Sequence, residues 1–292
     1  MKGIILAGGL GSRLYPMTLP ISKQLLPVYN KPMIYYPLGT LMLANIKDVM
    51  IVTNERDAEL YPRLFGDGSQ LGMNIEYGVQ YEPRGIVDAF MIGKDFIGDD
   101  DVCLILGDNI FYGHKLPELL QSAVTDVKEG KPAVIFGYYV QDPREYGVIE
   151  FDENYSVLSL EEKPARPRSN YAAVGLYMYS NSVVKRAEKI RPSARGELEI
   201  TDLNNRYLEN NELYLKTLGR GYAWFDTGTY DSLYEATSFV RSVERRQGLM
   251  IGCLEEIAYY MKFINKEQLI LATEPLKDND YKSYLLAKIG RE

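Results

Sequence analysis

The chain has 292 residues, of which 46% are hydrophobic and 25% are charged, as in an ordinary globular protein. Its formal net charge of -7 excludes general nucleic-acid binding, which needs a basic surface, although one cleft can still be locally positive. With one histidine and two cysteines, the chain has neither a multi-histidine zinc site nor a disulfide framework. It has no apolar run near ~20 residues and no signal-like N-terminus, so we expect a cytoplasmic protein without a membrane partner.

Apolar runs alternate with amphipathic segments through the first two-thirds of the chain. Strands are predicted at residues 3–6, 48–52, 74–79, 102–106 and 133–139, and helices at 33–44, 57–64, 87–94 and 116–128. This alternation predicts an α/β fold with a doubly wound, Rossmann-like sheet and right-handed crossovers. Ligands of such sheets bind beyond the carboxyl ends of the strands, so the turns after residues 6 and 106 are candidate sites.

The pattern changes after residue 145. Short strands are predicted at 148–151, 157–161 and 172–178, which makes the sheet mixed and indicates a small antiparallel extension that covers the site. Helices follow at 197–209 and 232–245, and the chain is predicted to be helical from residue 253 onward. We therefore expect an α/β domain over residues 1–250, with the extension at roughly 145–230, and a helical C-terminal segment over 251–292.

The first turn, LAGGLGSR at residues 6–13, follows a strand predicted to be buried on both faces. Its three glycines let the backbone approach a ligand closely, and Arg13 adds a forked cation suited to phosphate oxygens. The turn is not a GxxxxGK[ST] phosphate loop, which occurs nowhere in the chain, nor a dinucleotide fingerprint, which needs a glycine at Leu14. Pro16 and Pro20 would also interrupt the helix that follows such a fingerprint. An ordinary tight turn is the alternative to a nucleoside triphosphate site.

The segments GGLGSRL at 8–14 and SKQLLP at 22–27 together resemble the sugar nucleotidyltransferases, and among them most closely those that transfer a thymidylyl group to glucose 1-phosphate. Further segments fit the same pattern: QYEPRGI at 80–86, LGDN at 106–109, EEKP at 161–164, GELEITD at 196–202 and WFDTGT at 224–229. The resemblance implies the fold of the nucleotide-diphospho-sugar transferases. It also implies that dTTP and α-D-glucose 1-phosphate, with Mg²⁺ as cofactor, give dTDP-glucose and pyrophosphate.

The resemblance assigns a role to individual residues of this sequence. The expected catalytic residues are Arg13, Lys23, Asp108, Lys163 and Asp226, with Asp108 and Asp226 holding Mg²⁺. Nucleotide contacts are expected from Leu6, Gly8, Gly9, Gly11, Ser12, Arg13, Gln24, Gln80, Pro83, Gly85 and Asp108. The sugar phosphate is expected at Asn109, Tyr146, Gly147, Glu162, Lys163, Val174, Thr201 and Trp224. Gln80 would hydrogen-bond the thymine edge, and Gly85 would let the base lie close to the backbone.

Several of these residues have plainer interpretations without the resemblance. Lys23 is then a solvated loop lysine, Gln80 an exposed residue at a strand end, and Asp108 a turn residue. Asp226 would cap the helix that starts near residue 232, and the charges at 161–163 would form a solvated run. His114 is expected on the surface and Cys103 in the core.

Two alternatives for the function stay open: a transferase of the same scaffold that uses UTP, and a non-catalytic nucleotide-sugar sensor. The sensor is disfavoured because all the expected cations and metal carboxylates are present. The resemblance also implies a homotetramer with a second nucleotide site at an interface, used for feedback by dTDP-rhamnose. Tyr259 and Tyr260 fit an aromatic interface patch, but equally a helix that packs on its own domain.

Overall fold

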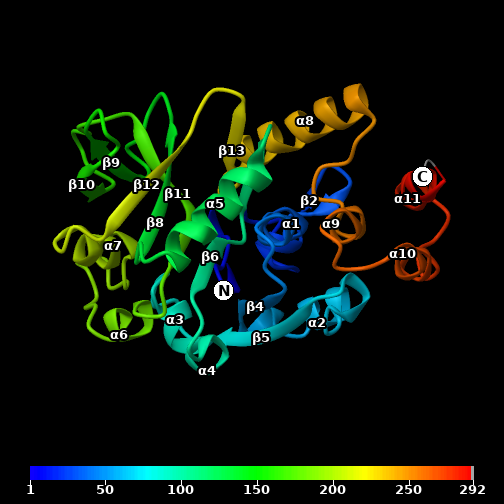
Figure 1. Cartoon of the computed structure of the whole chain (residues 1–292), viewed down its shortest axis with the longest axis horizontal. Helices are drawn as coiled ribbons and strands as arrows, with labels where there is room; N and C mark the ends of the chain where they lie inside the picture. Colours follow the sequence, from blue (N-terminus) through cyan, green and yellow to red (C-terminus); the bar gives the residue numbers. More distant parts are fainter. Residues whose placement is uncertain (291–292) are drawn as a thin grey trace.

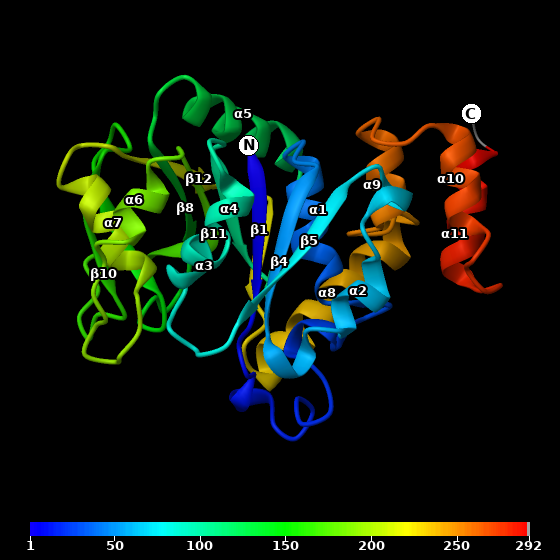
Figure 2. The ribbon, with the colours of Figure 1, turned by 90° about the horizontal axis from the view of Figure 1, so that it is seen from below.

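The computed structural model describes residues 1–290 and is organised around one nine-stranded mixed sheet (Figures 1 and 2). Its main path runs β10-β9-β11-β6-β1-β4-β5. The strands β1 (Lys2–Ala7), β4 (Asp48–Asn54), β5 (Asn74–Gln80) and β6 (Val102–Leu106) are mutually parallel neighbours, with β1 between β4 and β6. The predicted doubly wound sheet is therefore confirmed.

The antiparallel extension continues this sheet. It consists of β9 (Gly147–Phe151), β10 (Val157–Glu162) and β11 (Tyr171–Tyr179), and β11 pairs antiparallel with β6, Leu176 lying opposite Ile105. On the other side of β11 lies β8 (Ala133–Tyr139), and the unpredicted strand β12 (Leu213–Leu218) runs parallel to β8. The extension therefore begins where the parallel sheet ends, next to β6.

Helices cover both faces of the sheet (Figure 2). One face packs against α1 (Tyr35–Leu43), α2 (Leu60–Phe65) and α5 (Leu116–Lys128), and the other against α3 (Asp88–Ile92), α4 (Lys94–Ile97), α6 (Val183–Ala187) and α7 (Ile200–Leu208). Side chains of β1 alternate between the two cores, with Ile5 on the α1 face and Ile4 on the α3 face. The predicted helix at 87–94 is in fact interrupted at Gly93, where a Cβ atom would lie 2.9 Å from Ile4.

The apolar strand β6 is buried on both faces, which confirms the prediction that Cys103 lies in the core. Its residues from Val102 to Ile105, Cys103 included, have no exposed surface. Burial raises the pKa of the Cys103 thiol, so this cysteine behaves as a core residue. His114 is exposed, as predicted.

Two small ribbons were not predicted. β2 (Pro27–Val28) pairs with β3 (Lys31–Pro32), and β7 (Asn109–Gly113) pairs with β13 (Tyr222–Asp226), both antiparallel. The long helix α8 (Tyr230–Gln247) follows β13, and its N-cap is Thr229, whose Oγ1 accepts a hydrogen bond from the Ser232 amide at 3.2 Å. The interpretation of Asp226 as the cap of this helix is therefore wrong.

The C-terminal segment is helical, with α9 (Leu254–Tyr260), α10 (Lys266–Thr273) and α11 (Asp280–Ile289) at the end of the molecule opposite β10 (Figures 1 and 2). Leu254 and Ala258 of α9 are buried in the same core as α1, Tyr259 packs on that core, and Tyr260 is 72% exposed. The last two residues of the predicted segment 251–292 lie outside the described part, and the domain boundary at 250 stays a prediction. No helix within residues 1–290 has the length and apolarity to cross a membrane.

Candidate active site

The glycine turn and the turn after β6 meet at one edge of the sheet. Leu6 lies opposite Leu106 in the parallel pairing of β1 with β6, and the Gly107 amide donates to the Leu6 carbonyl at 2.9 Å. Gly11 has φ +62°, and a Cβ atom there would lie 2.9 Å from Thr18, so this position requires glycine. A single 3-10 turn at Ser12–Leu14 follows instead of a long helix, as predicted.

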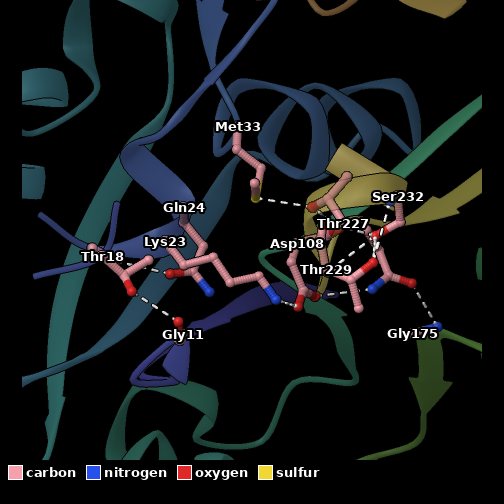
Figure 3. A network of polar contacts seen from close by, with 12 residues as sticks. Gly11, Thr18, Lys23, Gln24, Met33, Asp108, Gly175, Thr227, Thr229 and Ser232 are labelled. Carbon is pink, nitrogen blue, oxygen red and sulfur yellow. Dashed lines mark hydrogen bonds and ion pairs between the residues drawn. The ribbon is translucent and has the colours of Figure 1, made fainter. Parts of the chain in front are cut away.

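The unpredicted β7–β13 ribbon places Asp226 beside Asp108. Asn109 lies opposite Asp226 in the register of this ribbon. The backbone amide and the Oγ1 hydroxyl of Thr227 both donate to the Asp108 carbonyl, at 3.0 and 2.7 Å, and so fasten the end of β13 to the turn after β6 (Figure 3). Two carboxylates that are far apart in sequence thus become neighbours.

Lys23 forms a buried ion pair with Asp108. Its ammonium forms an ion pair with the Asp108 carboxylate, as Figure 3 shows, and Lys23 is only 7% exposed. Burial disfavours the charged form of Asp108, but the Lys23 charge and hydrogen bonds from Lys23 and from Asn109 Nδ2 (3.0 Å) outweigh burial and lower the pKa of Asp108. The interpretation of Lys23 as a solvated loop lysine is wrong.

Asp226 has the opposite environment. Burial and the Asp108 charge raise the pKa of Asp226 to about 6, although the Lys23 and Arg13 charges act in the other direction. Its Oδ1 atom is buried and accepts no hydrogen bond from residues 1–290. A pair of carboxylates with an unused buried oxygen fits a divalent cation, which takes oxygen ligands. Because no group of three or more His, Cys, Asp or Glu suited to a metal occurs in that range, ligand oxygens would complete the coordination shell.

A cavity of about 310 Å³ lies beside the two aspartates. The predicted site residues that line it are Arg13, Asp108, Asn109, Tyr146, Gly147, Glu162, Lys163, Trp224 and Asp226. Neither Arg13 nor Lys163 forms a salt bridge within residues 1–290, so both side chains are available to a ligand. The cavity therefore places the two aspartates together with the cations Arg13 and Lys163, a combination that suits a metal ion and phosphate groups.

Lys163 is exposed and directly follows β10. Its backbone has φ +45°, in the left-handed region that residues other than glycine seldom adopt, and its amide donates to the Tyr146 carbonyl at 3.0 Å. Unfavourable backbone conformations of this kind cluster at functional sites, where the surrounding structure holds them.

Glu162 is oriented by two neighbours at the extension end of the cavity. Its Oε2 accepts a hydrogen bond from Thr201 Oγ1 at 2.6 Å, and its Oε1 lies 3.4 Å from Arg195 Nη2. Thr201 itself does not line the cavity, and Val174 is fully buried in the core, with Gly175 lining the cavity instead. A direct sugar contact by Val174 or Thr201 therefore stays a prediction, although Thr201 contacts Glu162, which does line the cavity.

Among the cavity residues that the sequence does not predict, Arg195 and Glu199 are oppositely charged neighbours. Arg195 and Glu199 both line the cavity and pair with each other at 2.8 Å. Their spacing of four residues was visible in the sequence, but such a pair is also what an ordinary surface helix contains. Glu199 lies in the segment at 196–202 that fits the family pattern, whereas Arg195 lies just before it.

Asn109 connects the cavity wall to Asp108. It is 1% exposed, and its Oδ1 accepts from Trp224 Nε1 at 2.6 Å and from the Gly175 amide at 3.0 Å, while its Nδ2 donates to Asp108. These three hydrogen bonds join the Asn109 side chain to Trp224, Gly175 and Asp108, and they fix the orientation of both Trp224 and Asp108.

The predicted nucleotide contacts line the same edge of the sheet as the glycine turn. Gln80 ends β5 and is 8% exposed, so its interpretation as an exposed residue is wrong, and a Cβ atom on Gly8 would lie 3.0 Å from Gln80 Oε1. Gly85 has φ +104°, and a Cβ atom there would lie 2.6 Å from the backbone of Leu198. The close chain at Leu198 is therefore one reason for a glycine here, and the contact of Gly85 with the base stays a prediction.

The remaining predicted nucleotide contacts differ in exposure. Gln24 is buried and accepts a hydrogen bond from Ser22 Oγ at 2.9 Å, whereas Gly9, Ser12 and Pro83 are exposed.

This fold, with a glycine turn, paired aspartates and a cavity at the strand ends that also holds Arg13 and Lys163, is that of a nucleotidyltransferase. The profile of the family described as "Nucleotidyl transferase" matches residues 2–243. The chain is 54% identical to a glucose-1-phosphate thymidylyltransferase of Xanthomonas campestris pv. campestris, over 99% of this chain and 97% of that protein. It is 52% identical to those of Neisseria gonorrhoeae and Mycobacterium tuberculosis, over the whole of each chain. The chain therefore belongs to the nucleotidyl transferase family, in the group of glucose-1-phosphate thymidylyltransferases.

Solved structures agree with this placement. A glucose-1-phosphate thymidylyltransferase structure from Bacillus anthracis, in complex with sucrose, matches with a TM-score of 0.75 and 40% identity, over 82% of this chain and 95% of that one. A UDP-glucose pyrophosphorylase in complex with UDP-glucose matches with a TM-score of 0.74 over 83% of this chain and 98% of that one. At 23% identity, this second likeness supports the fold alone.

Proposed function

We propose that the chain converts dTTP and α-D-glucose 1-phosphate into dTDP-glucose and pyrophosphate. The proposal rests on the position of Asp108 and Asp226 beside a cavity that Arg13 and Lys163 also line, two cations without an ion-pair partner among residues 1–290. The choice of substrates is supported by relatives of 50% to 54% identity that are named for this reaction.

The chemistry required is the approach of two anions. A phosphate oxygen of glucose 1-phosphate attacks the α-phosphorus of dTTP, a new P–O bond forms, and the bond to pyrophosphate breaks on the opposite side. Arg13, next to the glycine turn, would offset triphosphate charge, and Lys163, beside Glu162, would offset the charge of the sugar phosphate. Fixing both phosphates in one line also removes much of the entropic cost of the encounter.

We propose Mg²⁺ as the cofactor, held by Asp108 and Asp226 and completed by phosphate oxygens. When bound, it would stabilise the negative charge that develops on the reacting phosphates. Lys23 supports this site by keeping Asp108 ionised at neutral pH, because only the carboxylate form binds a cation.

The other end of the cavity suits a hexose. Glu162, held by Thr201 and Arg195, would accept hydrogen bonds from sugar hydroxyls. Tyr146 and Trp224 form an aromatic pair with ring centroids 5.1 Å apart and offer an apolar wall to the sugar ring.

The test is pyrophosphate release by the purified protein with glucose 1-phosphate and dTTP, UTP, ATP or CTP in turn. We expect dTTP to give the highest kcat/KM, with one dTDP-glucose formed per pyrophosphate. A preference for UTP would instead indicate the uridylyltransferase alternative. Binding of nucleotide sugars without turnover of any triphosphate would indicate a sensor.

We further propose that this reaction is the first step towards dTDP-L-rhamnose in the cytoplasm, in a homotetramer inhibited by dTDP-rhamnose. A second cavity of about 330 Å³, which shares no lining residue with the first, supports a second ligand site; it is lined by residues that include Leu43, Tyr112, Glu256, Tyr260 and Lys288. The segment 251–292 would then form part of a subunit interface. Sedimentation should give four times 33.3 kDa, and Tyr260→Ala should weaken inhibition by dTDP-rhamnose.

A further inference from the structure

A buried carboxylate holds the side-chain amide of Gln80. Gln80 Nε2 donates to Asp88 Oδ2 at 3.1 Å and to the Gly85 carbonyl at 3.2 Å. Gln80 is 8% exposed and Asp88 is 6% exposed, so neither group is freely solvated. Both hydrogens of the Gln80 amide are therefore used inside the protein.

These partners allow only one orientation of the amide. A carboxylate and a carbonyl accept hydrogen bonds but donate none, so turning the amide by 180° would place Gln80 Oε1 against two other oxygen atoms. Oε1 consequently faces the glycine turn, where a Cβ atom on Gly8 would lie 3.0 Å away. No donor within the described part of the chain is hydrogen-bonded to Oε1. The protein thus presents a fixed, unused acceptor at the edge of the nucleotide site.

Helix capping does not explain Asp88. This residue begins α3, but its carboxylate accepts no backbone hydrogen bond within residues 1–290. Its other oxygen, Oδ1, lies 3.6 Å from Nη1 of Arg84, a residue whose side chain is 61% exposed. A buried carboxylate is costly unless it is paired, so its principal visible use is the bond to Gln80.

We propose that Asp88 is a positioning residue that sets the base selectivity of the nucleotide site by fixing Gln80 Oε1 as an acceptor. This inference rests on the proposed function, in which the base of the triphosphate lies against Gln80. Thymine and uracil present the N3–H donor of an imide, which Oε1 accepts. Cytosine presents a lone pair at N3, which Oε1 repels. The hydrogen-bonded pair of Asp88 and Gln80 therefore selects thymine and uracil over cytosine but does not distinguish thymine from uracil.

The test measures binding rather than turnover: calorimetric titration of the full chain with dTTP and with dCTP. Wild-type protein should bind dTTP roughly tenfold or more tightly than dCTP, because one nucleotide satisfies Oε1 and the other opposes it. Asp88→Asn keeps the size of the side chain but can donate as well as accept, so the amide of Gln80 is free to turn. The ratio of the two Kd values should fall roughly tenfold, mainly through tighter binding of dCTP. Asp88→Ser, which also donates and accepts, is the second variant if Asp88→Asn does not fold.

Three controls separate positioning from general support of the fold. Asp88→Glu keeps an acceptor and should retain most of the wild-type ratio. Arg84→Ala removes the other neighbour of Asp88 from an exposed position and should leave the ratio unchanged. In a Gln80→Ala background, Asp88→Asn should have no further effect on the ratio, because the group that contacts the base is absent.

The proposal is overturned if wild-type protein binds dCTP as tightly as dTTP, if Asp88→Asn weakens both nucleotides equally, or if the ratio changes as much without Gln80. The proposed function can fail separately. Protein that binds dTTP selectively but transfers nothing to glucose 1-phosphate would refute the reaction, while the same titrations would still decide the role of Asp88.

Discussion

Asp108 and Asp226 are neighbouring carboxylates with opposite tendencies to ionise. Lys23 stabilises the charge on Asp108, whereas Asp226 is buried, feels the charge of Asp108 and has a raised pKa. Their repulsion is present in the protein alone and would be relieved by a bound divalent cation. The two aspartates can therefore be tested through protein stability without metal and through activity with metal.

The raised pKa of Asp226 predicts a pH-dependent stability. In the presence of chelator, the pKa of Asp226 is about 6 in the folded protein and 3.8 in the unfolded chain. The folded protein therefore holds this proton more tightly, and the free energy of unfolding falls as the pH rises from about 4 to about 6. Asp226→Asn removes this loss and should stabilise the metal-free protein at pH 7 by about 3 kcal/mol, a few degrees in Tm. Thermal unfolding at pH 7 and pH 4 checks it. The gain should disappear at pH 4, and a variant no more stable than wild type at pH 7 contradicts the assignment.

Removal of a charge from the Lys23–Asp108 pair should reduce the rate of reaction. We expect Asp108→Asn and Lys23→Ala each to lower turnover by about 10²–10³, comparable to the loss of one preorganised electrostatic contact. Pyrophosphate release measures this, and Glu59→Gln, in a pair whose side chains are more than two-thirds exposed, serves as the control. Near-normal rates in both variants would remove the pair from the chemistry.

At the scale of elements, the long parallel strands and α5 were predictable because their hydrophobic patterns are strong and local. The β7–β13 ribbon was not, because its two five-residue strands are held by pairing between distant parts of the chain. Without the resemblance, nothing in the sequence would have placed Asp226 near Asp108. The same limit applies to Thr201, whose hydroxyl holds Glu162 in a way that only the packed structure reveals.

The loop between β5 and α3 depends on Gly85. Because φ is +104° and a Cβ atom would lie 2.6 Å from the Leu198 backbone, Gly85→Ala should destabilise the protein by about 1–3 kcal/mol and weaken dTTP binding. Gly219→Ala is the matched control, since a Cβ atom there meets nothing within 4 Å. Chemical denaturation and dTTP titration of both variants test this. Equal free energies of unfolding for the Gly85→Ala and Gly219→Ala variants would show that the loop accepts a Cβ atom at Gly85 without loss of stability.

At the scale of the whole molecule, the candidate active site lies where the parallel sheet passes into the antiparallel extension, whereas α10 and α11 occupy the far end (Figure 2). The arrangement of sheet and extension was predictable from the change of pattern after residue 145. The sharing of one core by α9 and α1 was not, because a helical pattern does not reveal what the helix packs against.

The intact enzyme should depend on a divalent metal. Excess chelator should abolish thymidylyl transfer, and Mg²⁺ added beyond the chelator should restore it, because two carboxylates and two cations are arranged for phosphates with a bound ion. Full activity in chelator would contradict this dependence. Unfolding curves with and without chelator serve as the control that chelation leaves the fold intact.

The most direct test of the account is a crystal structure of the protein with dTTP and Mn²⁺, in which the anomalous signal locates the ion. We predict an ion bonded to both Asp108 and Asp226, with the triphosphate along the glycine turn and in contact with Arg13. A bound thymidine nucleotide whose phosphates lie away from Arg13 and from both aspartates would contradict it.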